Sequence, residues 1–273
     1  MFIRTGSGVN LHVQQIGAGK PVVMVHGLIT ANLSMWYFGI APHIAKHFQV
    51  TMFDLPSHGR SDKMVNGYSI SEMSAQLGEI IQRMNLGPVH LVGHSFGGCI
   101  ATKFSIDNPD LVDSLCIIDS PFPPFEQHSL DSLRTQHATD VLQAMLPEEM
   151  YQKIHSRKFK RNKTIDNVEY IINRTTLLDD MSVEAEFSEK EIKSLVVPTT
   201  AIYGSDSDCR WVAPVLKKNI PQMVYEEVVG GHYLPIENVK ELSSLVLEHL
   251  FSNSPVSSNP VYSGLDKCML SNS

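Results

Sequence analysis

The clearest chemical signal in the chain is a serine among glycines, in the sequence Gly-His-Ser-Phe-Gly-Gly at residues 93–98. An apolar run at residues 89–92 precedes it, and a helical pattern follows it as far as Asn108-Pro109. A serine on a sharp strand-to-helix turn has a strained backbone and an exposed hydroxyl. The positions two residues before and two residues after it must be glycines, because other backbone comes very close there. The pattern predicts Ser95 as a nucleophile, and the competing interpretation is a chance pentapeptide in an ordinary turn.

A serine hydroxyl needs a histidine to take its proton, and that histidine needs a carboxylate to orient it. His232 is the predicted base, because it follows two glycines in a loop between the last strand and the last helix. His94 is a poorer candidate because it neighbours the serine in the sharp turn. His58 lies on a loop whose strand is not expected to meet Ser95.

The acid is predicted in the segment Tyr-Gly-Ser-Asp-Ser-Asp at residues 203–208, at the end of a strand. We favour Asp208 over Asp206, and one of the two could instead cap the helix that begins near Trp211. Asp119, at the end of an earlier strand, is the third candidate. With the acid in this segment the triad has the chain order serine, acid, histidine.

An oxyanion formed at the serine would need preorganised hydrogen-bond donors, which are often two backbone N–H groups. Phe96, directly after the serine, is predicted to supply one. Leu28 is predicted to supply the other, because it follows His26-Gly27 at the end of an apolar strand. A simple strand-terminating turn is the alternative interpretation of His26-Gly27.

The elements that must position these residues alternate between strand and helix, which predicts a mostly parallel, doubly wound α/β sheet. Eight strands are expected: two in the first twenty residues, then residues 21–25, 48–53, 89–92, 115–119, 196–203 and 224–229. No strand is expected between residues 121 and 194, where two to four helices would form a cap inserted after the sixth strand. The predicted core is therefore residues 1–120 and 195–251, the cap is 121–194, and 252–273 is expected to be a disordered tail.

These motifs resemble the α/β-hydrolase fold, and in particular its capped serine hydrolases, over roughly residues 9–251. The resemblance rests on four motifs in the family's order, at residues 26–27, 54–62, 93–98 and 230–232. One subset of that family has Gly-x-x-Ser-Asp after a strand, which residues 204–208 match, and this favours Asp208 as the acid. The serine at position 95 disfavours the family's haloalkane dehalogenases and epoxide hydrolases, which have aspartate there.

Composition excludes several other classes of protein. The net charge of −7 argues against a general nucleic-acid binder, and no apolar run is long enough to span a membrane. The glycine spacing matches no nucleotide-binding motif, and the twelve histidines show no metal-ligand spacing, so no cofactor and no metal are predicted. The N-terminus lacks the pattern of a secretion signal, and the four cysteines show no disulfide framework. A cytoplasmic protein is expected.

The leading functional hypothesis is hydrolysis of a small-molecule carboxylic ester through an acyl-enzyme. Three other reactions suit the same triad: hydrolysis of an acyl-coenzyme A or acyl carrier protein thioester, hydrolytic C–C cleavage, and perhydrolysis. The basic run at residues 157–163 could bind the phosphate of such a thioester, although a solvated helix end is the simpler interpretation. Outside enzymes, the chain could be a ligand-binding receptor that kept the fold.

Overall fold

The computed structural model describes residues 1–155, 163–184 and 187–254. Its strands are β1 (Phe2–Arg4), β2 (Asn10–Ile16), β3 (Pro21–Val25), β4 (Gln49–Phe53), β5 (Val89–His94), β6 (Val112–Ile118), β7 (Thr199–Gly204) and β8 (Val224–Val228). They form one sheet in the order β1-β2-β4-β3-β5-β6-β7-β8. β2 pairs antiparallel with both β1 and β4, and the other pairs are parallel. The predicted eight-stranded, mostly parallel sheet is confirmed.

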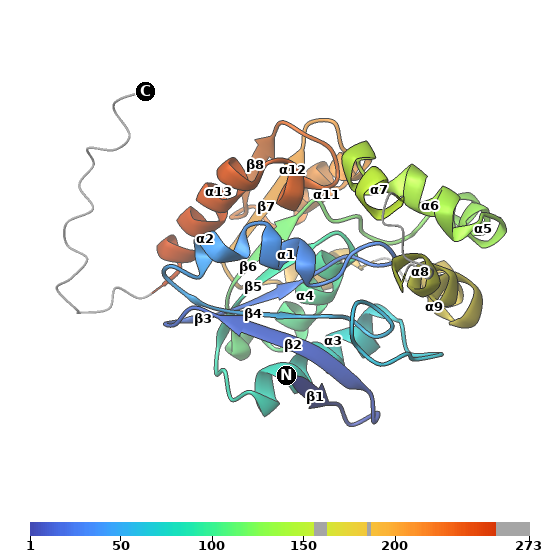
Figure 1. Cartoon of the computed structure of the whole chain (residues 1–273). Helices are drawn as coiled ribbons and strands as arrows, with labels where there is room; N and C mark the ends of the chain where they lie inside the picture. The colour runs from blue at the N-terminus through green and yellow to red at the C-terminus, as the bar shows by residue number, and fades with distance from the viewer. Residues whose placement is uncertain (156–162, 185–186, 255–273) are drawn as a thin grey trace.

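Helices cover both faces of this sheet, as Figure 1 shows. The core helices are α1 (Ser34–Phe38), α2 (Ala41–Ile44), α3 (Ile70–Arg83), α4 (Phe96–Asp107), α11 (Val212–Asn219), α12 (Leu234–Glu237) and α13 (Val239–Ser252), with short 3₁₀ turns η1 (Pro109–Leu111) and η2 (Asp208–Trp211). The helix expected around residues 34–47 is two short helices, separated at Gly39. A side chain at Gly39 would meet the carbonyl of Pro235, so the close approach of α12 requires glycine there.

Successive side chains of a strand point to opposite faces, so a sheet covered on both sides has two cores. In β3, Val23 and Val25 belong to one core, and Val22 and Met24 belong to the other. The first core includes α3 and α4, and the second includes α1, α2 and α13. Both cores are needed because the parallel strands between them carry apolar residues on each side.

Six helices are inserted between β6 and β7 in the described part of the chain, which is more than the two to four expected. They are α5 (Gln127–Thr135), α6 (Ala138–Met145), α7 (Glu148–His155), α8 (Lys163–Arg174), α9 (Leu177–Val183) and α10 (Glu189–Lys193). Figure 1 shows α5 to α9 together at one side of the sheet. Two hydrogen bonds join this inserted segment to the chain around the start of α3. The Thr176 N–H donates to the carbonyl of Val65, which precedes α3, and the N–H of Ile70, the first residue of α3, donates to the carboxylate of Glu184.

None of the described helices is both long and apolar enough to span a bilayer. The tail prediction for residues 252–273 falls largely outside the described residues. Its first three residues are described, and Ser252 ends α13.

Candidate active site

Ser95 lies at the turn from β5 into α4 and has a positive φ of 55°. A non-glycine residue in that region costs about 1–3 kcal/mol and persists only where its surroundings hold it. Two hydrogen bonds do so: the Ser95 N–H donates to the Ile118 carbonyl at 3.0 Å, and the Ser120 hydroxyl donates to the Ser95 carbonyl at 2.6 Å. The serine side chain stays partly exposed. The end of β6 therefore holds the turn that presents the serine.

The glycines around Ser95 are required by crowding. A Cβ added at Gly93 would lie 2.5 Å from the carbonyl oxygen of Gly97, and one at Gly98 would lie 2.6 Å from the Ser120 hydroxyl. Real Cβ atoms do not approach other atoms so closely, and backbone cannot move aside here without shifting the turn. The glycines of the motif thus allow β5, α4 and β6 to converge beside the serine.

His232 lies in the loop between β8 and α12, and its Nε2 is 2.9 Å from the Ser95 hydroxyl oxygen. The backbone carbonyl of His232 accepts a hydrogen bond from Nε2 of His94 at 2.7 Å. Burial lowers the pKa of His94 to about 3, so this ring is neutral and carries its proton on the donating Nε2. His94 therefore does not act on the serine but holds the backbone of the residue that faces it.

Asp119 follows β6 and is completely buried. Its Oδ2 lies 2.6 Å from Nδ1 of His232 and accepts the hydroxyl of Ser207 at 2.5 Å. Its Oδ1 accepts the backbone N–H of Gly204 at 2.9 Å. A carboxylate held in this way can orient His232 with its proton on Nδ1 and leave Nε2 free to accept one from Ser95.

The loop after β3 lies directly against the serine. A Cβ added at Gly27 would be 2.8 Å from Cβ and 3.1 Å from Oγ of Ser95. The next amide belongs to Leu28, and the first amide of α4 belongs to Phe96. Within the described chain no protein acceptor is hydrogen-bonded to either amide, so both N–H groups are available to a substrate oxygen.

Two buried histidines hold this loop in place. Nε2 of His26 accepts the amide of Leu55 at 3.0 Å, and Nε2 of His58 accepts the amide of Ile29 at 2.8 Å. Burial lowers the pKa of both rings, that of His58 to about 3. Each ring is therefore neutral and can accept at Nε2 while Nδ1–H donates to a nearby carbonyl. His58 does not approach the serine and instead supports residues 27–30, here called the oxyanion loop.

Known proteins similar to this chain also have the α/β-hydrolase fold. A family model described as the α/β-hydrolase fold matches residues 20–136. The chain is 33% identical over 111 residues to (E)-2-((N-methylformamido)methylene)succinate hydrolase of Acinetobacter baylyi, and the match covers 41% of each chain. It is 25% identical to the AB hydrolase superfamily protein YisY of Bacillus subtilis over 93% of this chain and 99% of that one.

Solved structures match over nearly the whole length. The esterase EaEST of Exiguobacterium antarcticum superimposes with a TM-score of 0.76 at 22% identity, covering 92% of this chain and 98% of the esterase. A thioesterase domain from the curacin biosynthetic pathway gives a TM-score of 0.68 at 25% identity, covering 90% and 98%. The chain has the α/β-hydrolase fold.

In this structure the carboxylate beside the histidine follows β6, and not β7 as expected for the acid. Asp208 begins η2 and Asp206 lies in the preceding turn; both are exposed, and the structure does not bring either to Nδ1 of His232. The residue between them, Ser207, faces inward and donates to Asp119. In the sequence, Asp119 also directly follows an apolar strand, and this made it a candidate for the acid alongside Asp206 and Asp208.

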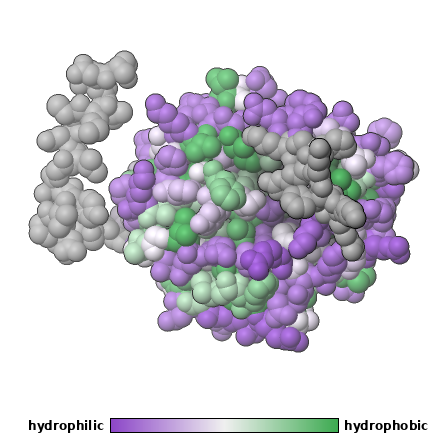
Figure 2. Space-filling view, in the orientation of Figure 1, coloured by the Kyte–Doolittle hydropathy of each residue, from purple (hydrophilic) through white to green (hydrophobic). Residues whose placement is uncertain are grey.

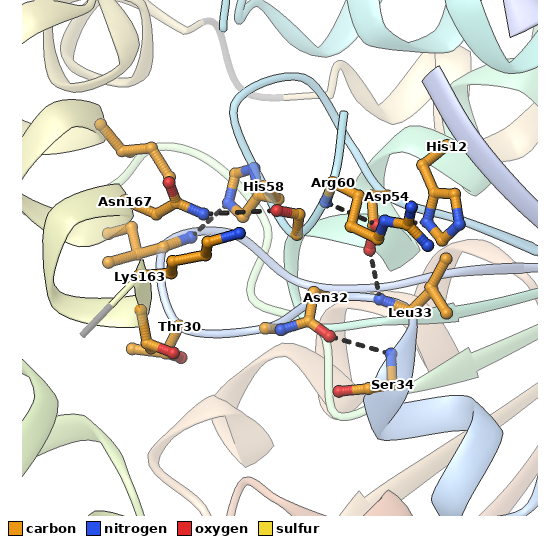
Figure 3. Close-up of a pocket in the computed structure, with 15 residues that line it drawn as sticks. His12, Thr30, Asn32, Leu33, Ser34, Asp54, His58, Arg60, Lys163 and Asn167 are labelled. Atoms are coloured by element: carbon orange, nitrogen blue, oxygen red, sulfur yellow. Dashed lines mark hydrogen bonds and ion pairs between the residues drawn. The ribbon is translucent and has the colours of Figure 1, made fainter. Parts of the chain in front are cut away.

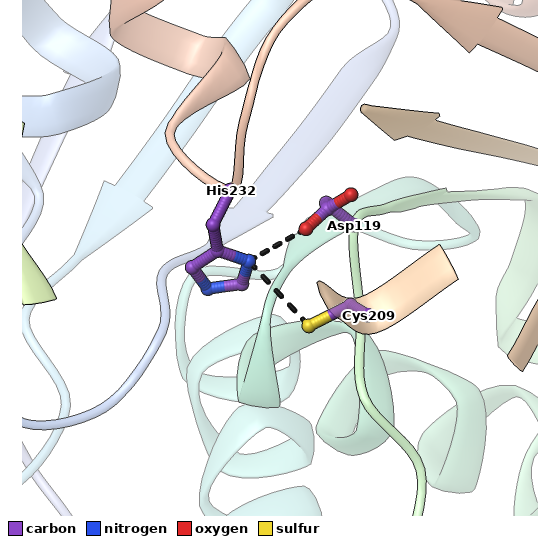
Figure 4. A group of neighbouring side chains, drawn as sticks. All are labelled: Asp119, Cys209 and His232. Atoms are coloured by element: carbon purple, nitrogen blue, oxygen red, sulfur yellow. Dashed lines mark hydrogen bonds and ion pairs between the residues drawn. The ribbon is translucent and has the colours of Figure 1, made fainter. Parts of the chain in front are cut away.

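The sequence analysis also missed Cys209, whose Sγ lies 3.6 Å from Nδ1 of His232. Figure 4 shows the thiol and the Asp119 carboxylate facing the same ring nitrogen. Burial raises the pKa of this thiol to about 12, so it is protonated at neutral pH. The cysteine comes from η2, on the segment where the acid was expected.

Two cavities flank the oxyanion loop. One of about 250 Å³ lies between that loop, the loop after β4 and α8; Figure 3 shows Lys163 and Asn167 on one side and Arg60 and His12 on the other. The second, of about 530 Å³, has a mostly apolar lining surface from Ala31, Met35, Phe38, Met150 and Ile236, to which the polar side chains of Asn32, Ser34 and Thr164 are added. Thr30 and Tyr233, which are hydrogen-bonded to each other at 2.7 Å, also line it. Tyr233 directly follows His232 in the chain, whereas His232 and Ser95 themselves are not among the described residues that line this apolar cavity.

Proposed function

We propose that this chain is a serine hydrolase that cleaves a carboxylic ester, with Ser95 as nucleophile, His232 as general base and Asp119 as the acid of the triad. The observation that carries the proposal is the continuous hydrogen-bonded chain from Ser95 Oγ through His232 to Asp119, with distances of 2.9 Å and 2.6 Å. The name of the A. baylyi relative describes a hydrolase, and this supports the same reaction class. The match spans only about two fifths of that relative's length, so the activity is proposed from the site.

The geometry suits acylation followed by deacylation. Nε2 of His232 takes the proton of Ser95 as Oγ attacks the ester carbonyl, and Asp119 stabilises the resulting imidazolium. The amides of Leu28 and Phe96 donate to the oxyanion. His232 then gives the proton to the departing alcohol oxygen. Water, deprotonated by the same nitrogen, attacks the acyl-enzyme and regenerates Ser95.

The apolar cavity supports a substrate with an uncharged hydrocarbon group. Its lining atoms are mainly carbon and sulfur from Met35, Phe38, Met150 and Ile236. Phe38 is 82% exposed at its rim, and Figure 2 shows apolar surface over α1 and α12 within a mostly polar face. Burying a hydrocarbon chain there is favourable by about 0.8 kcal/mol for each methylene removed from water.

A thioester is the second candidate, because a thioesterase domain superimposes on this chain about as well as the esterase does. The two substrates share the acyl group and differ in the leaving group. Residues 157–163, considered above for phosphate binding, lie almost wholly outside the described part of the chain. Lys163, the one described member, lines the smaller cavity of about 250 Å³. An apolar acyl group fits either substrate, and the ester is preferred because no described feature requires a large charged leaving group.

Intact-mass spectrometry after treatment with a fluorophosphonate tests the proposal. The wild-type protein is expected to gain one covalent adduct, and Ser95→Ala is expected to gain none, because only a serine beside a basic histidine attacks phosphorus quickly. Hydrolysis of p-nitrophenyl acyl esters of increasing chain length and of the matching acyl-coenzyme A thioesters is measured in parallel.

Faster turnover of esters than of thioesters of the same chain length would support the ester assignment, and the reverse order would replace it with a thioesterase. A folded wild-type protein that neither labels nor turns over any of these substrates would contradict the hydrolase. The ligand-binding receptor would then be the better description.

A further inference from the structure

Three metal-binding side chains converge beside the catalytic serine, two of them already assigned to the triad. The Oδ2 of Asp119, the Sγ of Cys209 and the Nδ1 of His232 all lie within 4.8 Å of one another. Figure 4 shows the carboxylate and the thiol on the same side of the imidazole, next to Nδ1. Cys209 has no part in the proposed acyl transfer, so its position against the histidine calls for a separate explanation.

Cysteine sulfur, histidine nitrogen and carboxylate oxygen are the ligands that Zn²⁺ uses in proteins, at distances of about 2.0–2.3 Å. Tetrahedral geometry at those lengths separates neighbouring ligand atoms by roughly 3.4–3.6 Å. The Cys209 Sγ to His232 Nδ1 distance is 3.6 Å and already fits. The Asp119 to His232 distance of 2.6 Å must open by roughly 0.8 Å to reach that separation. His232 follows Gly230 and Gly231 in its loop, which makes such a displacement of the ring inexpensive.

We propose that Asp119, Cys209 and His232 form an inhibitory site for Zn²⁺ or another thiophilic divalent cation. The metal binds Nδ1, the nitrogen that carries the orienting proton in the active state, and takes the carboxylate that would stabilise the imidazolium. With a cation on Nδ1 the single ring proton lies on Nε2, which can then no longer accept the proton of Ser95. Metal binding and acyl transfer are therefore mutually exclusive at His232. The inhibition rests on the proposed function, whereas metal binding does not.

The surroundings suit a bound cation. The Asp119 carboxylate is oriented by the amide of Gly204 and the hydroxyl of Ser207, which is the kind of outer hydrogen bonding that supports metal ligands. The His232 side chain is 29% exposed and Cys209 is partly exposed, so the cation has a route from solvent. The fourth ligand position can be taken by water.

Binding releases the thiol proton of Cys209 to solvent, because the metal takes the thiolate, and it moves the single proton of the neutral His232 ring from Nδ1 to Nε2, because the metal takes the lone pair of Nδ1. Burial raises the pKa of Cys209 to about 12, so at neutral pH its proton has to be displaced by the metal. Apparent affinity is therefore expected to increase as the pH rises.

Binding is tested directly with Co²⁺, which replaces Zn²⁺ and gives a thiolate-to-cobalt absorption band when it is bound by cysteine. The Ser95→Ala protein is used, so the result does not depend on turnover. The band is expected on Ser95→Ala, is expected to disappear when Zn²⁺ is added, and is expected to be absent from Ser95→Ala carrying Cys209→Ala. A Cys116→Ala change in place of Cys209→Ala is the matched control and should leave the band unchanged, since Cys116 is fully buried in β6.

Inhibition is tested by p-nitrophenyl ester hydrolysis in buffered free Zn²⁺, with Mg²⁺ as the hard-cation control. Cys209→Ala is expected to hydrolyse the ester at close to the wild-type rate without metal, and to need at least about tenfold more Zn²⁺ for half inhibition. Cys209→Ser serves as a second variant if the alanine protein does not fold.

Equal Zn²⁺ sensitivity of wild type and Cys209→Ala, or the absence of a cobalt band, would overturn the site. A cobalt band in a protein that hydrolyses none of the esters would support the metal site while the proposed function failed.

Discussion

At the scale of single residues, Asp119 receives three hydrogen bonds, from His232, Ser207 and Gly204. A buried carboxylate is stable only when its oxygens are satisfied in this way, because desolvation of an unpaired charge is very costly. The end of β7 and the turn after it, where the acid was expected, supply two of these donors, Gly204 and Ser207. Their contribution is therefore to support the acid that follows β6.

Replacing Asp119 and Asp208 in turn compares the two carboxylates as candidates for the acid of the triad. Asp119→Asn is expected to lower kcat on the order of 10³- to 10⁴-fold, since the carboxamide can stabilise the wrong tautomer of His232 and carries no charge. Asp208→Asn is the matched control and should stay within about twofold of wild type, because Asp208 is exposed. Steady-state kinetics on one p-nitrophenyl ester measures both. A larger loss in Asp208→Asn than in Asp119→Asn would return the acid to the β7 segment.

At the scale of elements, the oxyanion loop depends on contacts with two neighbours. On one side Gly27 packs against the side chain of Ser95. On the other side His26 and His58 join the loop to the segment after β4 through the amides of Leu55 and Ile29. Ile29 itself has a positive φ of 67°, so the hydrogen bond that its N–H donates to His58 holds a strained residue. The loop is consequently preorganised before any substrate binds.

Adding one methyl group to this loop should disable the serine. Gly27→Ala would place Cβ 2.8 Å from Cβ of Ser95, so either the serine or the loop must move. We expect kcat/KM to fall by at least about 100-fold, because a displacement of about 1 Å in catalytic geometry costs that much.

Gly87→Ala is the control for the glycine substitution. Gly87 has a φ of +68° and open space around its Cα, so the alanine should cost about 1 kcal/mol of stability and leave the activity unchanged. Thermal unfolding and ester hydrolysis are measured for both variants. Full activity in a folded Gly27→Ala protein would show that the loop does not position the reacting atoms.

At the scale of the whole molecule, the fold buries several histidines in their neutral form. Burial lowers the pKa of His58 and His94 to about 3, and of His90 and His249 to about 4. Each ring is charged in the unfolded chain below its usual pKa of 6.5 but stays neutral in the folded one. The unfolded state therefore binds more protons between about pH 6.5 and pH 3–4.

A fall in pH should consequently destabilise the folded protein well before its carboxylates are protonated. The stabilising contribution of these rings is complete above pH 6.5 and decreases as the pH falls towards their folded pKa values. From pH 7 to pH 5, we expect His58 and His94 each to lower the free energy of unfolding by about 2 kcal/mol.

Urea unfolding at the two pH values measures this loss, and His58→Gln should reduce the difference between them by about 2 kcal/mol. A wild-type protein as stable at pH 5 as at pH 7 would contradict the neutral, buried state of these rings.

The sequence by itself determined the features that depend on neighbours along the chain. The glycines at 93, 97 and 98 predicted the sharp turn at Ser95, the apolar runs predicted the strands, and the glycines before His232 marked its loop. These predictions rest on backbone sterics and burial, which act over a few residues. The roles of Ser95, His232, Leu28 and Phe96 remain predictions for the experiments above.

Which carboxylate lies against His232 was decided only by the tertiary structure. Asp119, Asp206 and Asp208 all follow apolar strands, and local pattern does not say which carboxylate reaches Nδ1 of His232. The sheet order places β6 directly beside β5, so the residue after β6 lies next to the serine turn. After β7, Asp208 is exposed, the hydroxyl of Ser207 faces Asp119, and the thiol of Cys209 faces His232. Distances between strand ends depend on how distant segments pair, and no short stretch of sequence contains that information.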